Sequence, residues 1–135
     1  MKAFIDTNVL VYAHDGAEIH KGSVAQSRLE HLEAKEEGVV STQVFLEFAA
    51  VARTKLKLSA GSISAIIRQY QLWEYVRHDA DAILHALEYS EQEEISIWDA
   101  MLVVAAERAR CKILYTEDLD HGQHIQGIKI INPFV

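Results

Sequence analysis

The chain of 135 residues has a formal net charge of −7, is 50% hydrophobic, and contains one proline and one cysteine. This length suits one domain, so we expect a single domain over residues 1–135. The hydrophobic content excludes a disordered chain, and the lone Cys111 excludes an internal disulfide. No segment is apolar over the roughly 20 residues that span a bilayer. We therefore expect a cytoplasmic protein that makes no membrane contact.

The negative charge opposes binding to nucleic acid, because Lys and Arg neutralise the phosphates of such ligands. The charge is unevenly distributed, however, since residues 48–73 contain no Asp or Glu. A basic face beside an acidic body suits an anionic substrate, although a solvated helix face explains the same pattern equally well. The candidate substrate-binding residues in this segment are Arg53, Lys55, Lys57 and Arg68.

Short apolar runs alternate with longer helical patterns along the chain. Gly38 is expected to end the second helix, because glycine is the usual residue after a helix C-terminus. Strands that alternate with helices predict an α/β fold with a parallel sheet. The predicted strands are 3–5, 39–41, 73–76, 112–116 and 128–131, and the predicted helices are 9–13, 20–37, 43–57, 60–71, 79–90 and 97–110.

Two acids follow predicted strands directly. Asp6 comes after the apolar run 3–5, and Asp118 lies in the turn after the strand 112–116. The functional crevice of an open parallel sheet lies beyond the carboxyl ends of its strands, so both carboxylates occupy expected site positions. Helix capping explains Asp6, and turn formation explains Asp118, without any function. Each acid alone is weak evidence.

Glu47 is the acid that structure explains least well. It lies within the predicted helix 43–57, with Val44 one turn before it and Val51 one turn after it on the same side. No basic residue stands three or four positions later in the sequence. A carboxylate on an apolar helix face is costly unless it is paired, hydrogen-bonded or bound to metal. We therefore interpret Glu47 as a functional residue.

Asp99 lies in the first turn of the predicted helix 97–110. Ser96 and Asp99 have the spacing of a capping box, and an acid at this position also suits the helix dipole. A structural role is compatible with a functional one. A helix start directed at the crevice would hold the same carboxylate near a cation.

Four carboxylates in one crevice would repel one another, and without a cation at least one would keep its proton. Mg²⁺ relieves such repulsion, because carboxylates, waters and substrate phosphates are its usual ligands, and Mn²⁺ accepts the same set. A pair of such ions about 3.5–4 Å apart activates water and stabilises the leaving oxygen during displacement at phosphorus. This chemistry needs little besides acids, so it suits a chain that carries Asp6, Glu47, Asp99 and Asp118 in these contexts.

Sequence motifs spread over nearly the whole chain carry a family resemblance. They are FIDTNVL at 4–10, STQVFLEF at 41–48, WDA at 98–100, TEDL at 116–119 and NPF at 132–134. On these motifs the chain resembles the PIN-domain ribonucleases, and most of all the VapC toxins of toxin–antitoxin pairs. The resemblance implies a metal-dependent endoribonuclease that acts on RNA. It also implies a PIN-like three-layer fold, in which helices cover both faces of a doubly wound parallel sheet.

The resemblance assigns further roles. It implies the same four acids as the metal site, with Thr7, Asn8 and Thr116 as neighbours that position water or metal. Asp120 is an additional acid in a turn where the family pattern leads us to expect a neutral polar residue, so we include it among the neighbours. The resemblance also implies a homodimer and a cognate antitoxin of the VapB type.

Other functions are open at this stage. A PIN nuclease of RNA processing without an antitoxin would carry the same acids, and a PIN-like module could bind RNA or protein without cleaving it. His121 and His124 have the spacing of helical zinc ligands, but no further His or Cys joins them at a familiar spacing. The first strand lacks the glycine-rich turn of a dinucleotide site. A phosphate-accepting signalling domain would need adjacent acids after that strand.

Overall fold

The computed structural model describes residues 1–135. Six strands and six helices alternate in the order that the sequence predicts, apart from one additional short strand near the C-terminus. The elements are β1 (Ala3–Ile5), α1 (Thr7–Ala13), α2 (Ile19–Lys35), β2 (Gly38–Ser41), α3 (Thr42–Thr54), α4 (Ala60–Tyr70), β3 (Glu74–Val76), α5 (Ala80–Glu93), α6 (Ile97–Arg108), β4 (Ile113–Tyr115), β5 (His124–Ile125) and β6 (Ile128–Ile131).

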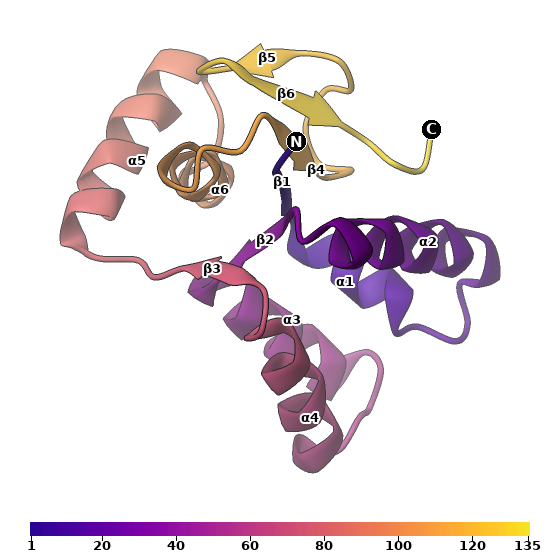
Figure 1. The fold of residues 1–135 in the computed structure, drawn as a ribbon. Helices are drawn as coiled ribbons and strands as arrows, with labels where there is room; N and C mark the ends of the chain where they lie inside the picture. Colours follow the sequence, from indigo (N-terminus) through magenta and orange to yellow (C-terminus); the bar gives the residue numbers. More distant parts are fainter.

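The strands form one sheet in the order β3-β2-β1-β4-β6-β5. Every neighbouring pair is parallel except β5 and β6, which are antiparallel. Helices α5 and α6 lie on one side of the strands, and α1 and α2 lie on the other (Figure 1). The predicted α/β fold, with a mostly parallel sheet and helices on both faces, is confirmed.

Strand β1 lies at the point where the order of the sheet reverses. The chain runs outward from β1 through β2 to β3, and then returns to place β4 on the other side of β1. Ile5 pairs with Tyr115, and the Asp6 amide donates a hydrogen bond to the Tyr115 carbonyl at 3.0 Å. The residues that follow β1 and β4 therefore emerge side by side at a topological switch point, where open α/β sheets bind ligands.

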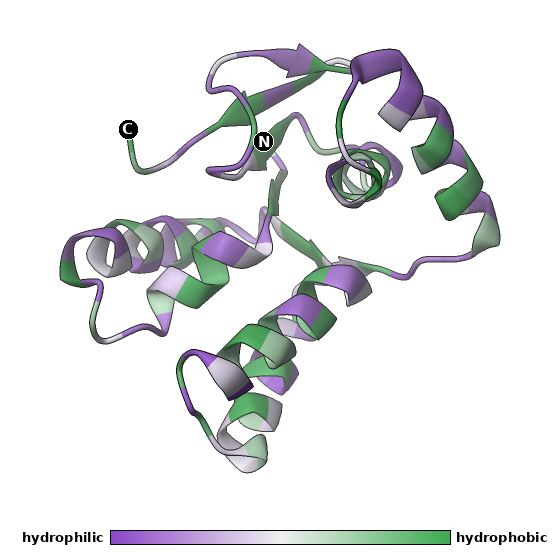
Figure 2. Ribbon diagram, turned by 180° about the vertical axis from the view of Figure 1, so that it is seen from behind, coloured by the Kyte–Doolittle hydropathy of each residue, from purple (hydrophilic) through white to green (hydrophobic).

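Helix α6 is the most deeply buried helix. All residues from 100 to 106 are buried, because the sheet covers one side of α6 and α5 covers another. Figure 2 shows α6 as a predominantly hydrophobic ribbon in this central position. An apolar sequence on all sides of a helix is typical of such burial. No helix of the chain combines the length and the hydropathy that a membrane crossing requires.

The sequence did not predict β5. This strand has two residues, and it returns along β6 through Gln126 and Gly127, whose φ angles are 52° and 80°. Two consecutive residues with positive φ are the signature of a type I′ hairpin turn. A strand of two residues is too short to produce an alternating pattern, so only the turn could have indicated it.

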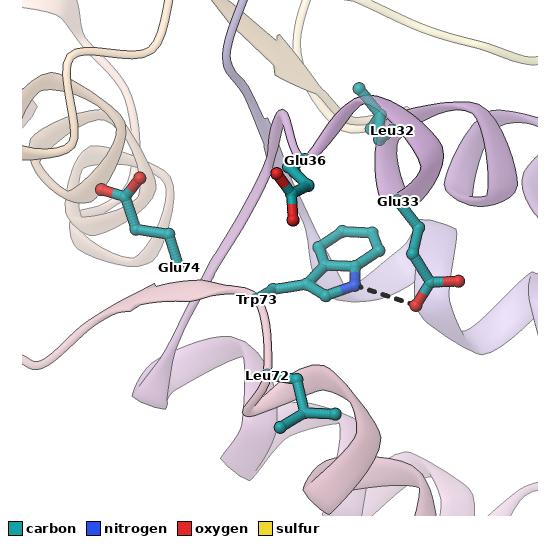
Figure 3. A pocket seen from close by; sticks show the side chains of 7 residues that line it. Leu32, Glu33, Glu36, Leu72, Trp73 and Glu74 are labelled. Atoms are coloured by element: carbon teal, nitrogen blue, oxygen red, sulfur yellow. Dashed lines mark hydrogen bonds between the residues drawn. The ribbon is translucent and has the colours of Figure 1, made fainter.

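The predicted end of the second helix was wrong. Helix α2 ends at Lys35, and the left-handed residue that stops it is Glu36, with a φ of 54°. Gly38 is instead the first residue of β2, where the Trp73 ring packs against it. A Cβ atom added at Gly38 would lie 2.2 Å from the nearest atom of that ring. Figure 3 shows Trp73 reaching toward α2, where its indole nitrogen donates to Glu33.

We expect Gly38→Ala to lower the free energy of unfolding by about 1–3 kcal/mol, because overpacking must displace the Trp73 ring. Urea unfolding measures this change. Gly61→Ala is the matched control, since its added Cβ would meet nothing closer than 3.9 Å and alanine favours a helix. Equal stability of Gly38→Ala and the wild type would contradict the proposed packing role of Gly38.

Candidate active site

Asp6 stands at the centre of the site. It is only 4% exposed and serves as the N-cap of α1, where one side-chain oxygen accepts from the Thr7 amide at 2.6 Å. Its other oxygen accepts from the Thr116 hydroxyl at 2.7 Å, and Thr116 is itself fully buried. The capping role that the sequence suggested is therefore real. Capping uses one carboxylate oxygen, while the second faces the end of β4.

Asn8 links Asp6 to Asp118. Its side-chain amide nitrogen lies 3.3 Å from Asp6 Oδ2 and 3.1 Å from Asp118 Oδ2. The same nitrogen lies 3.4 Å from the Thr116 hydroxyl, which also accepts from the Asp118 amide at 3.1 Å. The residues after β1 and β4 thus form one hydrogen-bonded group that contains two of the four acids.

Helix α3 brings Glu47 to the same group. The Thr7 hydroxyl donates to Glu47 Oε1 at 3.3 Å, across 40 residues of sequence. Glu47 is partly buried, and no other hydrogen bond or ion pair engages its carboxylate. A single hydroxyl satisfies few of the acceptor positions of an ionised carboxylate, so Glu47 keeps oxygen atoms available for a cation.

Asp99 enters from the start of α6. The Ser96 hydroxyl caps this helix by accepting from the Asp99 amide at 3.1 Å. The Asp99 side chain is partly buried, and the neighbouring Ser96 hydroxyl is the only hydrogen-bonding group that lowers its pKa. Ser96 is the N-cap, as the sequence predicts, and no cationic side chain pairs with the Asp99 carboxylate.

No positively charged side chain balances the acids of the site. Burial raises the pKa of Asp6 to about 7, against the Thr116 and Thr7 hydrogen bonds that lower it, and the charges of Asp118 and Glu47 raise it further. Burial likewise raises the pKa of Asp99, and nearby Asp118 adds to the rise. None of the five ion pairs in the chain involves any of the four acids.

The remaining predicted residues do not join this group. Asp120 is exposed and shares a separate cavity of about 210 Å³ with Asp118 and residues of the turn before α6. The four basic candidates are exposed and unpaired, at the far end of α3 and on the segment and helix that follow. Arg53 is six residues beyond Glu47, which corresponds to about 9 Å along the helix axis. The four basic candidates are Arg53, Lys55, Lys57 and Arg68.

A second polar cluster supports the turn that carries Asp118, and the sequence analysis missed it. The Tyr12 hydroxyl donates to Glu117 at 2.7 Å, and the Lys21 ammonium lies 3.2 Å from the other oxygen of Glu117. Lys21 also lies over the Tyr12 ring, 4.7 Å from its centroid. Glu117 is thereby engaged away from the four acids. The signal in the sequence was the i, i+4 spacing of Asn8 and Tyr12, which places both on one face of α1.

The residues present suit a hard divalent cation. Besides the carboxylates, Asn8 contributes a buried side-chain oxygen that has no hydrogen-bond partner, and amide oxygens are ligands for such ions. As the side chains lie, no group of three or more His, Cys, Asp or Glu side chains converges closely enough to hold an ion. The donor chemistry therefore fits Mg²⁺ or Mn²⁺, while binding would require these side chains to move together.

Comparison with known proteins agrees with the fold. Residues 3–124 match the PIN domain, which is most of the chain. The chain belongs to the PIN-domain family. No curated protein matches the sequence.

Several solved structures of toxin–antitoxin proteins share this fold. It superposes on a toxin–antitoxin complex from Klebsiella pneumoniae with a TM-score of 0.73 and 17% identity, covering 98% of both chains. The sarcin–ricin loop cleaving toxin VapC20 of Mycobacterium tuberculosis gives 0.65 and 18% identity, over 88% of this chain and 92% of that one. DNA-bound VapBC of Salmonella typhimurium gives 0.67 and 18% identity, over 96% of each. At these identities the likeness shows a shared fold.

We expect the metal-free PIN domain to lose stability as the pH rises from about 4 to 7. The folded state raises the pKa of Asp6 from 3.8 to about 7, so in this window the folded chain holds a proton that the unfolded chain has released. The free energy of unfolding should fall by an amount on the order of a few kcal/mol and should level off above about pH 7, the pKa of Asp6 in the folded state. Urea unfolding at a series of pH values in EDTA measures it.

Asp6→Asn should flatten this pH dependence, since its amide carries no charge in either state. Asp81→Asn, which changes an exposed carboxylate on α5, should keep the wild-type slope. A wild-type slope that persists in Asp6→Asn would show that the buried carboxylate does not carry the effect.

Proposed function

We propose that this PIN domain is a metal-dependent endoribonuclease that hydrolyses phosphodiester bonds of RNA. Asp6, Glu47, Asp99 and Asp118 form its catalytic site in this proposal, and the whole chain acts as one domain. The observation that carries the proposal is the buried Asp6 carboxylate, whose pKa the neighbouring acids help to raise in a site without any cationic side chain. Such a cluster is costly for folding alone, so it favours a bound cation.

Each residue of the proposed site has a separate role. Thr116 and the Thr7 amide fix the Asp6 carboxylate, and Asn8 spans the space between Asp6 and Asp118. Thr7 orients Glu47 through its hydroxyl. When bound, Mg²⁺ or Mn²⁺ would supply the positive charge that activates water and stabilises the leaving oxygen at phosphorus. Asp6 would then release its proton, because a nearby cation favours the charged carboxylate.

We further propose that the nuclease is the toxin of a toxin–antitoxin pair and binds a VapB-type antitoxin. Support comes from the solved structures with the same fold, which include DNA-bound VapBC and a sarcin–ricin loop cleaving toxin. A homodimer is part of this proposal. Helix α5 exposes a stripe of apolar side chains that suits a protein contact, namely Ile83, Leu84 and Leu87.

Purified protein free of any partner should cut RNA when Mg²⁺ or Mn²⁺ is present and should stop when EDTA is added. Glu47→Gln and Asp99→Asn should lower the rate by about 100-fold or more, the scale for losing one charge-stabilising group in a site. Gel analysis of a structured cellular RNA mixture measures the rate.

Glu30→Gln is the matched control, because it removes an exposed carboxylate on α2 and should leave the rate unchanged. Metal titration calorimetry on the same samples reports on the site without cleavage. RNA cutting by Glu47→Gln at the wild-type rate would remove Glu47 from the site. Absence of both cutting and metal binding would favour a module that only binds RNA or protein.

The exposed cations after Glu47 should contribute to RNA affinity through phosphate contacts. Replacing Arg53 and Lys57 together by alanine should weaken RNA binding and make its salt dependence shallower, with a change in logarithmic slope of about 1.4 for two lost single-strand contacts. Filter binding in Ca²⁺ at several salt concentrations measures the slope. Lys35→Ala with Lys112→Ala is the control pair, since both residues lie near the amino ends of strands β2 and β4, whereas Asp6 and Asp118 follow the carboxyl ends of strands. An unchanged slope in the first pair would place the RNA elsewhere.

A further inference from the structure

Asp118 is the one proposed catalytic acid that lies in a turn. Asp6 caps α1, Glu47 lies within α3 and Asp99 lies in the first turn of α6. Asp118 is instead exposed in the segment that follows β4. Sites built on helices and strands hold their side chains more precisely than sites on loops. Asp118 therefore needs support from outside its own segment.

The placement of Asp118 matters for the whole site, because Asp118 lies near two of the other acids. Besides burial, the charge of Asp118 raises the pKa of both Asp6 and Asp99. Its Oδ2 atom accepts from Asn8 at 3.1 Å, and its amide donates to the Thr116 hydroxyl at 3.1 Å. Asp118 thus joins the acid that follows β1 to the acid that starts α6.

Glu117, the residue before Asp118, has a partner for each of its carboxylate oxygens. Oε1 accepts from the Tyr12 hydroxyl at 2.7 Å, and Oε2 lies 3.2 Å from the Lys21 ammonium. The contact with Tyr12 is the stronger one, because a short hydrogen bond to a charged carboxylate is strong whereas an exposed ion pair contributes little. Both partners engage Glu117 outside the group of acids.

One face of α1 contacts Glu117 and Asp118 in succession. Asn8 and Tyr12 lie one turn apart on this face, where Asn8 bonds to Asp118 and Tyr12 bonds to Glu117. Leu119, on the other side of Asp118, packs partly buried against the core. Two hydrogen bonds from a single helix face therefore fix the position of this part of the turn.

The ring of Tyr12 is itself held in place. The Phe134 ring packs edge-on against it at a centroid distance of 5.0 Å, and the Lys21 ammonium lies 4.7 Å from its centroid. These contacts use the faces and edges of the ring and not the hydroxyl. The hydroxyl is therefore a directed donor on a packed ring, and a phenylalanine in its place would keep the packing.

We infer that Tyr12 and Glu117 are positioning residues of the nuclease, whose hydrogen bond places the Asp118 carboxylate for metal binding and cleavage. Glu117 is not a metal ligand, although it is an acid next to one, because both of its oxygens are engaged elsewhere. Loss of a group that orients a metal ligand typically costs about 10- to 100-fold in metal affinity or activity. This inference rests on the proposed nuclease function.

Calorimetric titration with Mn²⁺ in the absence of RNA tests the hydrogen bond. Tyr12→Phe should raise the Kd for Mn²⁺ by about 10- to 100-fold. Glu117→Ala should have a similar effect, and the double variant should be no worse than Glu117→Ala alone, because both changes remove the same contact. Glu117→Gln should bind Mn²⁺ nearly as well as the wild type, since its amide oxygen can still accept from Tyr12.

A role of Glu117 as an additional metal ligand predicts the opposite order. Glu117→Gln would then weaken Mn²⁺ binding strongly, because it removes a charged ligand, and Tyr12→Phe would not weaken it, because it frees the carboxylate. That order would overturn the inference. Tyr75→Phe is the matched control and should keep the wild-type Kd, since Tyr75 lies on the edge strand β3 and its hydroxyl accepts from Arg77.

Cleavage kinetics at saturating Mn²⁺ provide the second measurement. Tyr12→Phe should lower kcat by about tenfold or more and leave KM for RNA unchanged, because a positioning residue acts on the chemical step. A raised KM with the wild-type kcat would make Tyr12 an RNA-binding residue. Wild-type kcat and Kd in Tyr12→Phe would leave its hydroxyl a structural role alone. Either result would overturn the inference and leave the nuclease standing.

Failure of the nuclease itself has a different signature. Amide hydrogen exchange in EDTA, followed by NMR, reports on the turn without metal or RNA. Tyr12→Phe should speed exchange of the Asp118 amide by about tenfold, the scale of one lost hydrogen bond to a charged group, while the amides of α6 exchange as in the wild type. This result in a protein that neither binds Mn²⁺ nor cuts RNA would support the hold of Tyr12 on the turn and count against the nuclease. Unchanged exchange of the Asp118 amide would overturn the inference in either case.

Discussion

Burial of the Asp6 carboxylate among other acids is the constraint on which the site depends. Asp6 cannot move into water, because its first oxygen caps α1 and its second accepts from the buried Thr116. Both bonds stabilise the charged form, yet burial and the neighbouring charges outweigh them and raise the pKa to about 7. The folded chain therefore keeps a group that is poorly satisfied in either protonation state. On the proposed function, a bound cation compensates this electrostatic cost.

The sheet explains why the acids meet at all. The pairing of Ile5 with Tyr115 fixes β1 beside β4, so that Asp6 and Thr116 follow neighbouring strand ends. Helix α3 starts directly after β2, the other neighbour of β1, and carries Glu47 toward Thr7. Residues 100–106 of helix α6 are buried, which fixes the direction of the helix and hence the position of Asp99 in its first turn. The geometry of the site is a consequence of strand order and core packing, and it does not require any unusual local conformation.

Much of this architecture could be predicted from the sequence, because the signals are local. Three local signals indicate burial directly: the apolar run before Asp6, the apolar helix face around Glu47, and the strongly apolar sequence of α6. The resemblance to PIN domains then implies that the parallel sheet is doubly wound. Contacts between distant segments left no such signal. The sequence suggested that Gly38 ends a helix. The structure shows that glycine is required there because the Trp73 ring, 35 positions later in the sequence, leaves no room for a Cβ atom. The link from Tyr12 and Lys21 to Glu117 likewise joins distant segments, and only the spacing of Asn8 and Tyr12 on α1 pointed to it.

The net charge of −7 and the proposed RNA substrate can be reconciled through the same constraint. Four carboxylates at the cutting site would repel a phosphate at short range, where a low dielectric strengthens charge interactions. A cation bound by the acids reverses the sign of this local field, and the exposed cations along α3 and beyond can then act on the neighbouring backbone. Metal and RNA binding should therefore be coupled, each raising the affinity for the other, as linkage requires. On the proposed function, the acidic body of the protein does not oppose substrate binding but makes it conditional on the metal.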